Sequence, residues 1–349
     1  SMARWQEKSS TAQSLIGGAT FEEVDEYTVN LVLEEPSVFT LSALGGSLQF
    51  PAIMPKDVVE AATETGVEEF VGTGPFKFVE WKTDQYIHLA KYEDYAPVDF
   101  EADGLGGKKE ALVDNIYINI VTDPNTQLTG IQTGQYDIGY GFNYDMIDQL
   151  ENTEDVEAII PFIGQYALIY NKTEGIFTDQ KMRQAIAYGL DLETIANAAL
   201  NGHYRMSSSY MQEEQVAWAS DAGSEKYNNP DLDKAKALLE EAGYNGEPIR
   251  LIATREYSYM YDSAVVMKEQ LEEIGVNLEL EIYDWSTVVN KRSDPEQWEL
   301  FITGFPVTMT PVEQLFFNDS WIDGPEDDKT EELLRAISYA DTQEEAKTH

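Results

Sequence analysis

The sequence predicts an α/β fold in which two blocks of strands and helices flank one connecting strand. Three observations lead to this prediction: strands that alternate apolar and polar residues, capped amphipathic helices between them, and a connecting segment, Ile159–Tyr170, that lacks a Gly-Pro linker. Alternation with a period of two indicates a half-buried strand, and a period near 3.6 indicates a helix. Strands and helices that follow one another in this way are typical of α/β domains.

The first block begins with strands. Residues 27–33 (YTVNLVL) alternate and end shortly before Pro36, which cannot donate to a strand ladder. Gly72 and Gly74 permit a tight turn into a predicted hairpin, whose strands are residues 75–81 and 86–90. Residues 101–110 are rich in glycine and charge, and they predict a flexible inserted loop.

A β-α-β unit is predicted at the end of this block. Residues 115–121 (NIYINIV) alternate strictly. Asp123 then caps a short helix that has Pro124 at its first position and Gly134 just past its end. Residues 136–138 (YDI) read as the next strand. This order implies a parallel sheet with a right-handed crossover.

The second block shows the same alternation more clearly. Helices are predicted at residues 178–188, 191–202, 232–242 (opened by Asn229-Pro230) and 262–274, and strands at 249–252, 276–282 and 298–303. Gly243 and Gly275 stop the third and fourth helices, because glycine readily adopts the left-handed conformation at a helix end. The last stretch, residues 327–348, reads as one acidic surface helix.

The amino-acid composition excludes several classes of function. The 349 residues include 64 Asp and Glu against 23 Lys and Arg, a formal net charge of −41. Such a chain repels polyanions, so we expect no nucleic-acid partner. The acidic residues are spread along the chain, which fits a solvated surface or an adaptation to high salt. The absence of cysteine excludes disulfides, and no apolar run is long enough to span a membrane.

Aromatic residues gather where the predicted strands of the second block end. Ligands of open α/β sheets lie at the carboxyl ends of the strands. Rings there could stack on a ligand while their polar atoms orient it, and the alternative is that they fill the core or contacts between lobes. The candidates are Tyr257, Tyr259, Tyr261, Trp285 and Phe305.

Arg255 lies in the same predicted loop, and its guanidinium could clamp a ligand carboxylate. A salt bridge to a nearby acid such as Glu256 is the alternative. His88 and His203 are isolated, and no residue cluster has metal-ligand spacing, so we expect neither a metal nor a cofactor. The sequence also lacks a nucleophile elbow, a phosphate loop and a zinc-protease motif, so it suggests no catalytic residue.

Five segments in order give the chain a family resemblance. They are VGTGPFKFVEW (71–81), DPNTQLTGIQTGQYDI (123–138), YNKTEGIFTDQKMRQAIAYGLD (170–191), NPDLDKAKALLEEAGY (229–244) and QLEEIGV (270–276). Together they resemble the extracytoplasmic solute-binding proteins of peptide-type ABC importers, the family 5 solute-binding class. The resemblance extends over nearly the whole chain.

The resemblance implies a two-lobed, periplasmic-binding-protein-like fold, similar to type II with an extra subdomain and truncated at both ends. Residues 1–80 would be part of the extra subdomain of lobe one, and residues 81–162 its incomplete core. Residues 163–349 would be lobe two, without its C-terminal return to lobe one.

The resemblance also implies a function: a monomeric receptor that encloses a peptide or similar small solute by hinge closure and delivers it to an ABC permease. Such a receptor acts outside the cytoplasmic membrane, commonly on a lipid anchor. From their place in the loops after the predicted strands, the ligand-binding candidates for such a receptor are Arg255, Tyr257, Tyr259, Trp285, Phe305 and Thr308.

One departure leaves the ligand open. Peptide binders of the family place an Asp, which holds the ligand's α-amino group, in the loop that corresponds to residues 304–311. Here Thr308 to Thr310 occupy that place, and Glu313 is the nearest carboxylate. A sugar, an opine or another amine therefore stands beside peptides as a ligand. Two alternative functions are a carboxylate-dependent hydrolase and a sensory module on the same fold.

Overall fold

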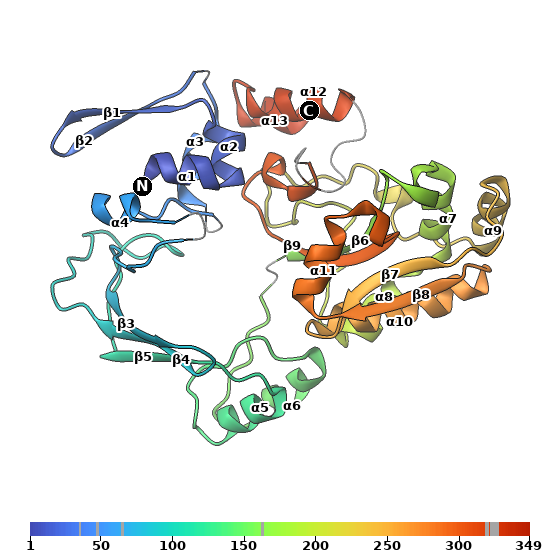
Figure 1. The fold of residues 1–349 in the computed structure, drawn as a ribbon, viewed down its shortest axis with the longest axis horizontal. Coiled ribbons are helices and arrows are strands. Elements are labelled where there is room, and N and C mark those ends of the chain that lie inside the picture. Colours follow the sequence, from blue (N-terminus) through green and yellow to red (C-terminus); the bar gives the residue numbers. More distant parts are fainter. Residues whose placement is uncertain (35, 47–48, 64–65, 162–163, 318–320, 322–327) are drawn as a thin grey trace. The chain divides into compact units, whose positions relative to one another are not determined.

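The structure is a computed structural model, and it describes residues 1–34, 36–46, 49–63, 66–161, 164–317, 321 and 328–349 (Figure 1). The chain divides into two compact units. Unit 1 comprises Ser1–Gln127 and Arg335–His349, and unit 2 comprises Leu128–Leu334. The division of the chain into lobes at residues 162 and 163 stays a prediction.

Unit 1 is built from short helices and two separate antiparallel sheets. Its helices are α1 (Met2–Lys8), α2 (Ser10–Ile16), α3 (Thr40–Gly45), α4 (Lys56–Glu60) and α13 (Gln343–Thr348). A two-stranded ribbon pairs β1 (Thr20–Asp25) with β2 (Thr28–Val32), and a three-stranded sheet has the order β3 (Phe76–Lys82), β4 (Tyr86–Lys91), β5 (Asn115–Asn119). The predicted hairpin of residues 75–90 is therefore present as β3 and β4.

The predicted parallel β-α-β unit is wrong. β5 pairs antiparallel with β4, and no strand forms at residues 136–138. After α5 (Pro124–Gln132), Gly134 takes a positive φ of 70°, and the backbone N–H groups of Gln135 and Tyr136 both donate to the Gly130 carbonyl. These two N–H groups close the end of the helix, so they are not available to pair with a neighbouring strand. Ile138 is 88% exposed, so no buried face holds that segment in a register.

Unit 2 is built around a four-stranded mixed sheet with the order β6-β9-β7-β8. The strands are β6 (Gly164–Tyr170), β7 (Ile249–Thr254), β8 (Leu278–Tyr283) and β9 (Leu300–Pro306). β7 pairs parallel with both β8 and β9, while β6 pairs antiparallel with β9. In the predicted connecting segment 159–170, the strand begins at Gly164, and residues 162 and 163 lie outside the described residues.

Helices cover the two faces of this sheet, so most side chains of its central strands, β7 and β9, are apolar. Leu251, Leu300 and Ile302 pack with α7 (Gln180–Gly189), α8 (Leu192–Leu200), α9 (Leu232–Glu241) and α10 (Ser258–Glu273) in one large core cluster. Ile252 and Phe301 face the other way, toward α11 (Trp285–Arg292) and Trp298. Each fully buried Leu, Ile or Phe stabilises the fold by about 1.5–3 kcal/mol relative to an exposed one.

The predicted helix stops at Gly243 and Gly275 are confirmed, and three Asp side chains cap helix starts in the same block. The side chains of Asp179, Asp191 and Asp231 accept backbone N–H bonds at the starts of α7, α8 and α9. Gly243 and Gly275 have φ values of 76° and 91° just past α9 and α10, where a side chain would be strained.

Two helix predictions need correction. α10 begins at Ser258, four residues before the predicted start. The sequence does not signal this start, because the N-cap residue, Tyr257, makes no capping hydrogen bond with its side chain. The acidic stretch forms two helices, α12 (Asp328–Ser338) and α13, in place of one. The side chain of Thr342 caps the start of α13 by accepting a hydrogen bond from the Glu345 N–H. Residue 327 lies outside the described residues.

Candidate functional site

The three parallel strands of unit 2 end at one edge of the sheet. Thr254 pairs with Tyr283 at the ends of β7 and β8. β6 runs the other way, so its first residue, Gly164, pairs with Pro306 at the end of β9. Figure 1 shows β7 and β8 side by side above α8 and α10. The loops after these strands carry the residues that the sequence singles out.

Four aromatic side chains form a continuous strip along this edge, and we call it the aromatic strip. Tyr166 contacts Tyr259 with ring centroids 5.2 Å apart, and Tyr257 lies 6.2 Å from Tyr259. Trp285 meets Tyr257 edge-on at 5.3 Å. Tyr257 is 43% exposed, whereas burial raises the pKa values of Tyr166 and Tyr259. The strip therefore offers both solvent-facing rings and neutral hydroxyl groups.

Gly304 in β9 leaves room for the side chain of Tyr259. A Cβ atom at Gly304 would lie 2.9 Å from the Tyr259 hydroxyl oxygen, closer than such contacts normally come. Tyr166 accepts a 3.3 Å hydrogen bond from the Ser263 hydroxyl, which fixes the other end of the strip. Two strands and α10 thus position these rings.

The side chain of Arg255 packs against Tyr261 of α10. Its Nη2 donates to the hydroxyl of Tyr261 at 2.9 Å, and its Cζ lies 4.4 Å from the centroid of the same ring. Glu256 does not pair with it: the Glu256 carboxylate accepts the backbone N–H of Trp285 at 2.9 Å. This bond ties the loop after β7 to the start of α11, and it holds Tyr257 and Trp285 together.

The loop after β9 is closed by its own hydrogen bonds. Phe305 is only 2% exposed and packs against Phe316 and Trp321, at 5.0 and 5.8 Å. Thr308 donates from its hydroxyl to the Thr310 carbonyl, and its own carbonyl accepts from Gln215. Phe305 is thus a core side chain of unit 2 in this structure, and its role as a ligand contact stays a prediction, as does that of Thr308.

The carboxylate of Glu313 is hydrogen-bonded within the same loop. Its carboxylate accepts the backbone N–H and the hydroxyl of Thr310, both at 2.8 Å. Burial raises the pKa of Glu313. The carboxylate is thus part of a capping box, and it is not aimed away from the loop.

The sequence-based reasoning missed Tyr166, Asp262 and Arg292. Tyr166 reaches the edge because β6 runs antiparallel, an orientation that the segment GQYALIY does not itself specify. Asp262 follows Tyr261 in α10, and burial, with repulsion by Asp145, raises its pKa. Arg292 ends α11, and two turns of helix bring it back over Trp285 at 5.6 Å. An i, i+7 spacing on one helix face was the available signal.

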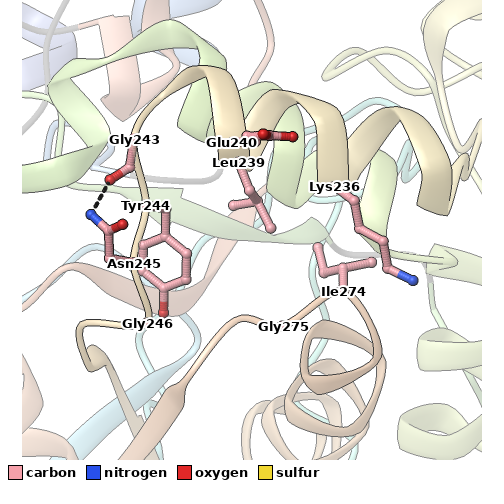
Figure 2. Close-up of a pocket in the computed structure, with 9 residues that line it drawn as sticks. All are labelled: Lys236, Leu239, Glu240, Gly243, Tyr244, Asn245, Gly246, Ile274 and Gly275. Carbon is pink, nitrogen blue, oxygen red and sulfur yellow. Dashed lines mark hydrogen bonds between the residues drawn. The ribbon is translucent and has the colours of Figure 1, made fainter.

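A separate pocket of about 400 Å³ lies at the other end of the sheet (Figure 2). Gly246 and Gly275 precede β7 and β8, so this pocket is at the amino ends of the strands. Tyr244 donates to the Glu247 carbonyl at 2.7 Å and accepts from the Asn277 N–H at 2.9 Å, which satisfies its hydroxyl. The lining residues are Lys236, Leu239, Glu240, Gly243, Tyr244, Asn245, Gly246, Ile274 and Gly275.

Two further properties concern the described residues alone. They contain no group of three or more His, Cys, Asp or Glu side chains that could hold a metal ion. Among them, no helix combines the length and the apolar character needed to cross a membrane.

Comparisons with known proteins place the chain among binding proteins. The family model described as "Bacterial extracellular solute-binding proteins, family 5 Middle" matches residues 3–321. A probable peptide ABC transporter periplasmic-binding protein of Sinorhizobium fredii is 30% identical over 327 residues, which cover 87% of this chain and 59% of that protein. The oligopeptide-binding protein AppA of Bacillus subtilis is 28% identical over 329 residues, which cover 84% and 57%.

A solved structure shows the same fold. The periplasmic binding protein DppA of Helicobacter pylori, in complex with the peptide STSA, superimposes with a TM-score of 0.79 at 24% identity. The superposition covers 97% of this chain and 66% of that one. The chain thus spans somewhat more than half the length of the two relatives and about two thirds of the solved protein.

Proposed function

The chain belongs to the bacterial extracellular solute-binding proteins of family 5, and from this premise we propose that it captures a peptide or a similar small solute for an ABC importer. The observation that carries the proposal is the aromatic strip at the carboxyl edge of the parallel strands, where ligands of open α/β sheets bind. Rings at such an edge provide apolar contact area, and their hydroxyl groups provide orientation.

The proposed mechanism is hinge closure between two lobes. A solute that binds the closed form better than the open form shifts the population toward the closed form. The closed receptor then delivers the solute to a membrane permease. We place this step outside the cytoplasmic membrane, with the full-length protein a monomer held by a lipid anchor and without a nucleic-acid partner.

Peptides are the first ligand class to test, because the relatives in Sinorhizobium and Bacillus are named for peptides. Within residues 307–317, the described part of the segment after β9, the one acid is Glu313, and its carboxylate already serves Thr310. Sugars, opines and other amines therefore belong in the same panel. The hydrolase alternative loses its support, because the family and these relatives are named as binding proteins.

The test measures the melting temperature and the scattering radius of the protein against a panel of peptides, sugars and opines. By mass action, a solute that binds only the folded state stabilises it by about 2.7 kcal/mol at a concentration of 100 times its Kd. This stabilisation raises the melting temperature. We expect at least one class to raise it and to reduce the radius. If no member of the panel changes either quantity, the proposal is wrong.

A further inference from the structure

Strand β5 is an open edge of the three-stranded sheet in unit 1. The order β3-β4-β5 pairs β5 with β4 alone, and among the described residues no strand pairs with its other side. Natural proteins protect such an edge with lysine, proline or a bulge, because its free N–H and C=O groups can pair with another chain. Residues 115–122 (NIYINIVT) contain no charge and no proline, and the register of β5 with β4 runs without a bulge.

The ladder to β4 shows which backbone groups of β5 point toward the open side. The N–H of Ile120 donates to the Gln85 carbonyl at 2.8 Å, so position 120 faces β4. In an antiparallel ladder, the residues that bond to the partner strand alternate along the chain. The even-numbered residues therefore bond to β4, and Asn115, Tyr117 and Asn119 direct their backbone N–H and C=O groups outward.

The sequence of β5 reads the same in both directions. Its residues, Asn115-Ile116-Tyr117-Ile118-Asn119, form a palindrome centred on the tyrosine. Two copies that meet antiparallel across a two-fold axis at Tyr117 would pair Asn with Asn, Ile with Ile and Tyr117 with itself. Their outward N–H and C=O groups would then form about six backbone hydrogen bonds between the copies. Self-complementarity of this kind is what a two-fold interface requires.

The side chains of β5 would also match across this axis. Ile116 and Ile118 lie on one face of the sheet, beside their β4 partners Leu89 and Ile87. Isoleucines of the two copies would therefore meet on this apolar face. Tyr117 lies on the other face, and its ring would meet the same ring of the second copy. Cross-strand pairs of aromatic or β-branched side chains stabilise a sheet.

The exposed apolar surface along this edge suits a small interface. Five large apolar residues in β5 or next to it are at least 43% exposed: Leu112, Val113, Tyr117, Ile118 and Ile120. Their exposed parts amount to roughly 600 Å², whereas each partner of a standard interface buries about 800 Å². The area fits a specific dimer of moderate affinity.

We propose that two copies of this chain pair antiparallel through β5, in register at Tyr117, and join their three-stranded sheets into one. The inference goes beyond the proposed function. It concerns this chain of 349 residues, whereas the monomer proposed above concerns the full-length protein. Solute capture is placed on unit 2, so a failure of the dimer would leave the proposed function standing.

Salt should strengthen this dimer. The net charge of −41 on each copy opposes association, because like charges repel. Salt screens the repulsion, since the Debye length falls from about 10 Å at 0.1 M to about 3 Å at 1 M. The contact itself consists of backbone hydrogen bonds and apolar side chains, so it contains no ion pair that salt would weaken.

The first test introduces a single cysteine, because the chain has none of its own. In the proposed register, the Cα atoms of the two Tyr117 residues lie about 5.5 Å apart, as in any hydrogen-bonded antiparallel pair, and this distance suits a disulfide. We expect Tyr117→Cys to form a disulfide-linked dimer under mild oxidation, measured on non-reducing gels.

Two controls define the register. In Ile118→Cys the two sulfur-bearing positions are diagonal neighbours about 7–8 Å apart, too far for a disulfide. Tyr27→Cys lies at the turn after β1, where the tyrosine is 90% exposed, and it reports random collisions. Both should cross-link at least tenfold more slowly than Tyr117→Cys. Equal rates in the three variants, or no dimer of Tyr117→Cys, overturn the proposal.

The second test is sedimentation velocity of the unmodified chain at about 0.1 M and about 1 M NaCl. We expect a dimer with a Kd on the order of micromolar at the higher salt, and a weaker one at the lower salt. Tyr117→Lys places two like charges opposite each other at the axis and should weaken the dimer at least tenfold. Tyr27→Lys changes the net charge equally and should leave the dimer unchanged.

Three results of the sedimentation test overturn the proposal. They are a chain that stays monomeric at the higher salt, a dimer that dissociates as salt rises, and a dimer that Tyr117→Lys leaves as strong as before. Circular dichroism checks that Tyr117→Lys is folded. If it is not, the cross-linking rates of the cysteine variants decide.

Discussion

The pairing of Arg250 with Glu299 provides a quantitative test of the sheet that carries the site. The backbone N–H, Nε and Nη2 of Arg250 donate to the Glu299 carboxylate at 2.7, 2.9 and 2.6 Å, and the two side chains are 32% and 20% exposed. Breaking a fully buried ion pair costs about 3–5 kcal/mol, and an exposed pair contributes about 0–1 kcal/mol. For this partly exposed pair, Glu299→Gln should lower the free energy of unfolding by about 2 kcal/mol in urea titrations followed by tryptophan fluorescence.

The matched control is Glu272→Gln. Glu272 pairs with Lys268 on the surface of α10, where the side chains are 54% and 37% exposed, so the change should cost less than about 0.5 kcal/mol. A loss below about 0.5 kcal/mol for Glu299→Gln would refute the reasoning. It would mean that Glu299 is not held by Arg250, and that the alignment of β9 beside β7 is incorrect.

The remaining predictions concern the edge of the sheet. Trp285→Ala removes a ring of the aromatic strip and should weaken solute binding about tenfold or more by calorimetry; unchanged affinity would contradict its role. Gly304→Ala places a Cβ atom 2.9 Å from the Tyr259 hydroxyl and should weaken binding severalfold with little change in melting temperature. The hydroxyl of Thr287, foremost among several donors, lowers the pKa of Asp284 from its ordinary 3.8 to about 2. Because the folded pKa lies below the unfolded one, the stability from Asp284 is present above about pH 4 and lost toward pH 2, and Asp284→Asn should flatten that dependence. A carboxyl titration by NMR with a midpoint near 4 would argue against it.

Local signals account for the parts of unit 2 that could be predicted. Asp179 and Asp191 begin the helices predicted at residues 178–188 and 191–202, and the side chain of each caps its helix. Gly243 and Gly275 end two helices because they tolerate positive φ. These features depend on neighbouring residues only, so a single sequence contains them.

The missed features depend on residues that are distant in the sequence or on weak local signals. Tyr257 caps α10 without a side-chain bond, so nothing marks the start that brings Tyr259 and Tyr261 into the helix. The strand order β6-β9-β7-β8 brings Tyr166 to the edge, and no local pattern encodes that order. The exposed fraction of Phe305, 2%, depends on Phe316 and Trp321 packing over it.

Native mass spectrometry after incubation with a mixed peptide digest tests the central claim most directly. The account predicts one solute retained per chain, released on denaturation with its mass unchanged, and retained less by Trp285→Ala. A spectrum without any retained solute, or peptides of the digest shortened by the protein, would contradict it.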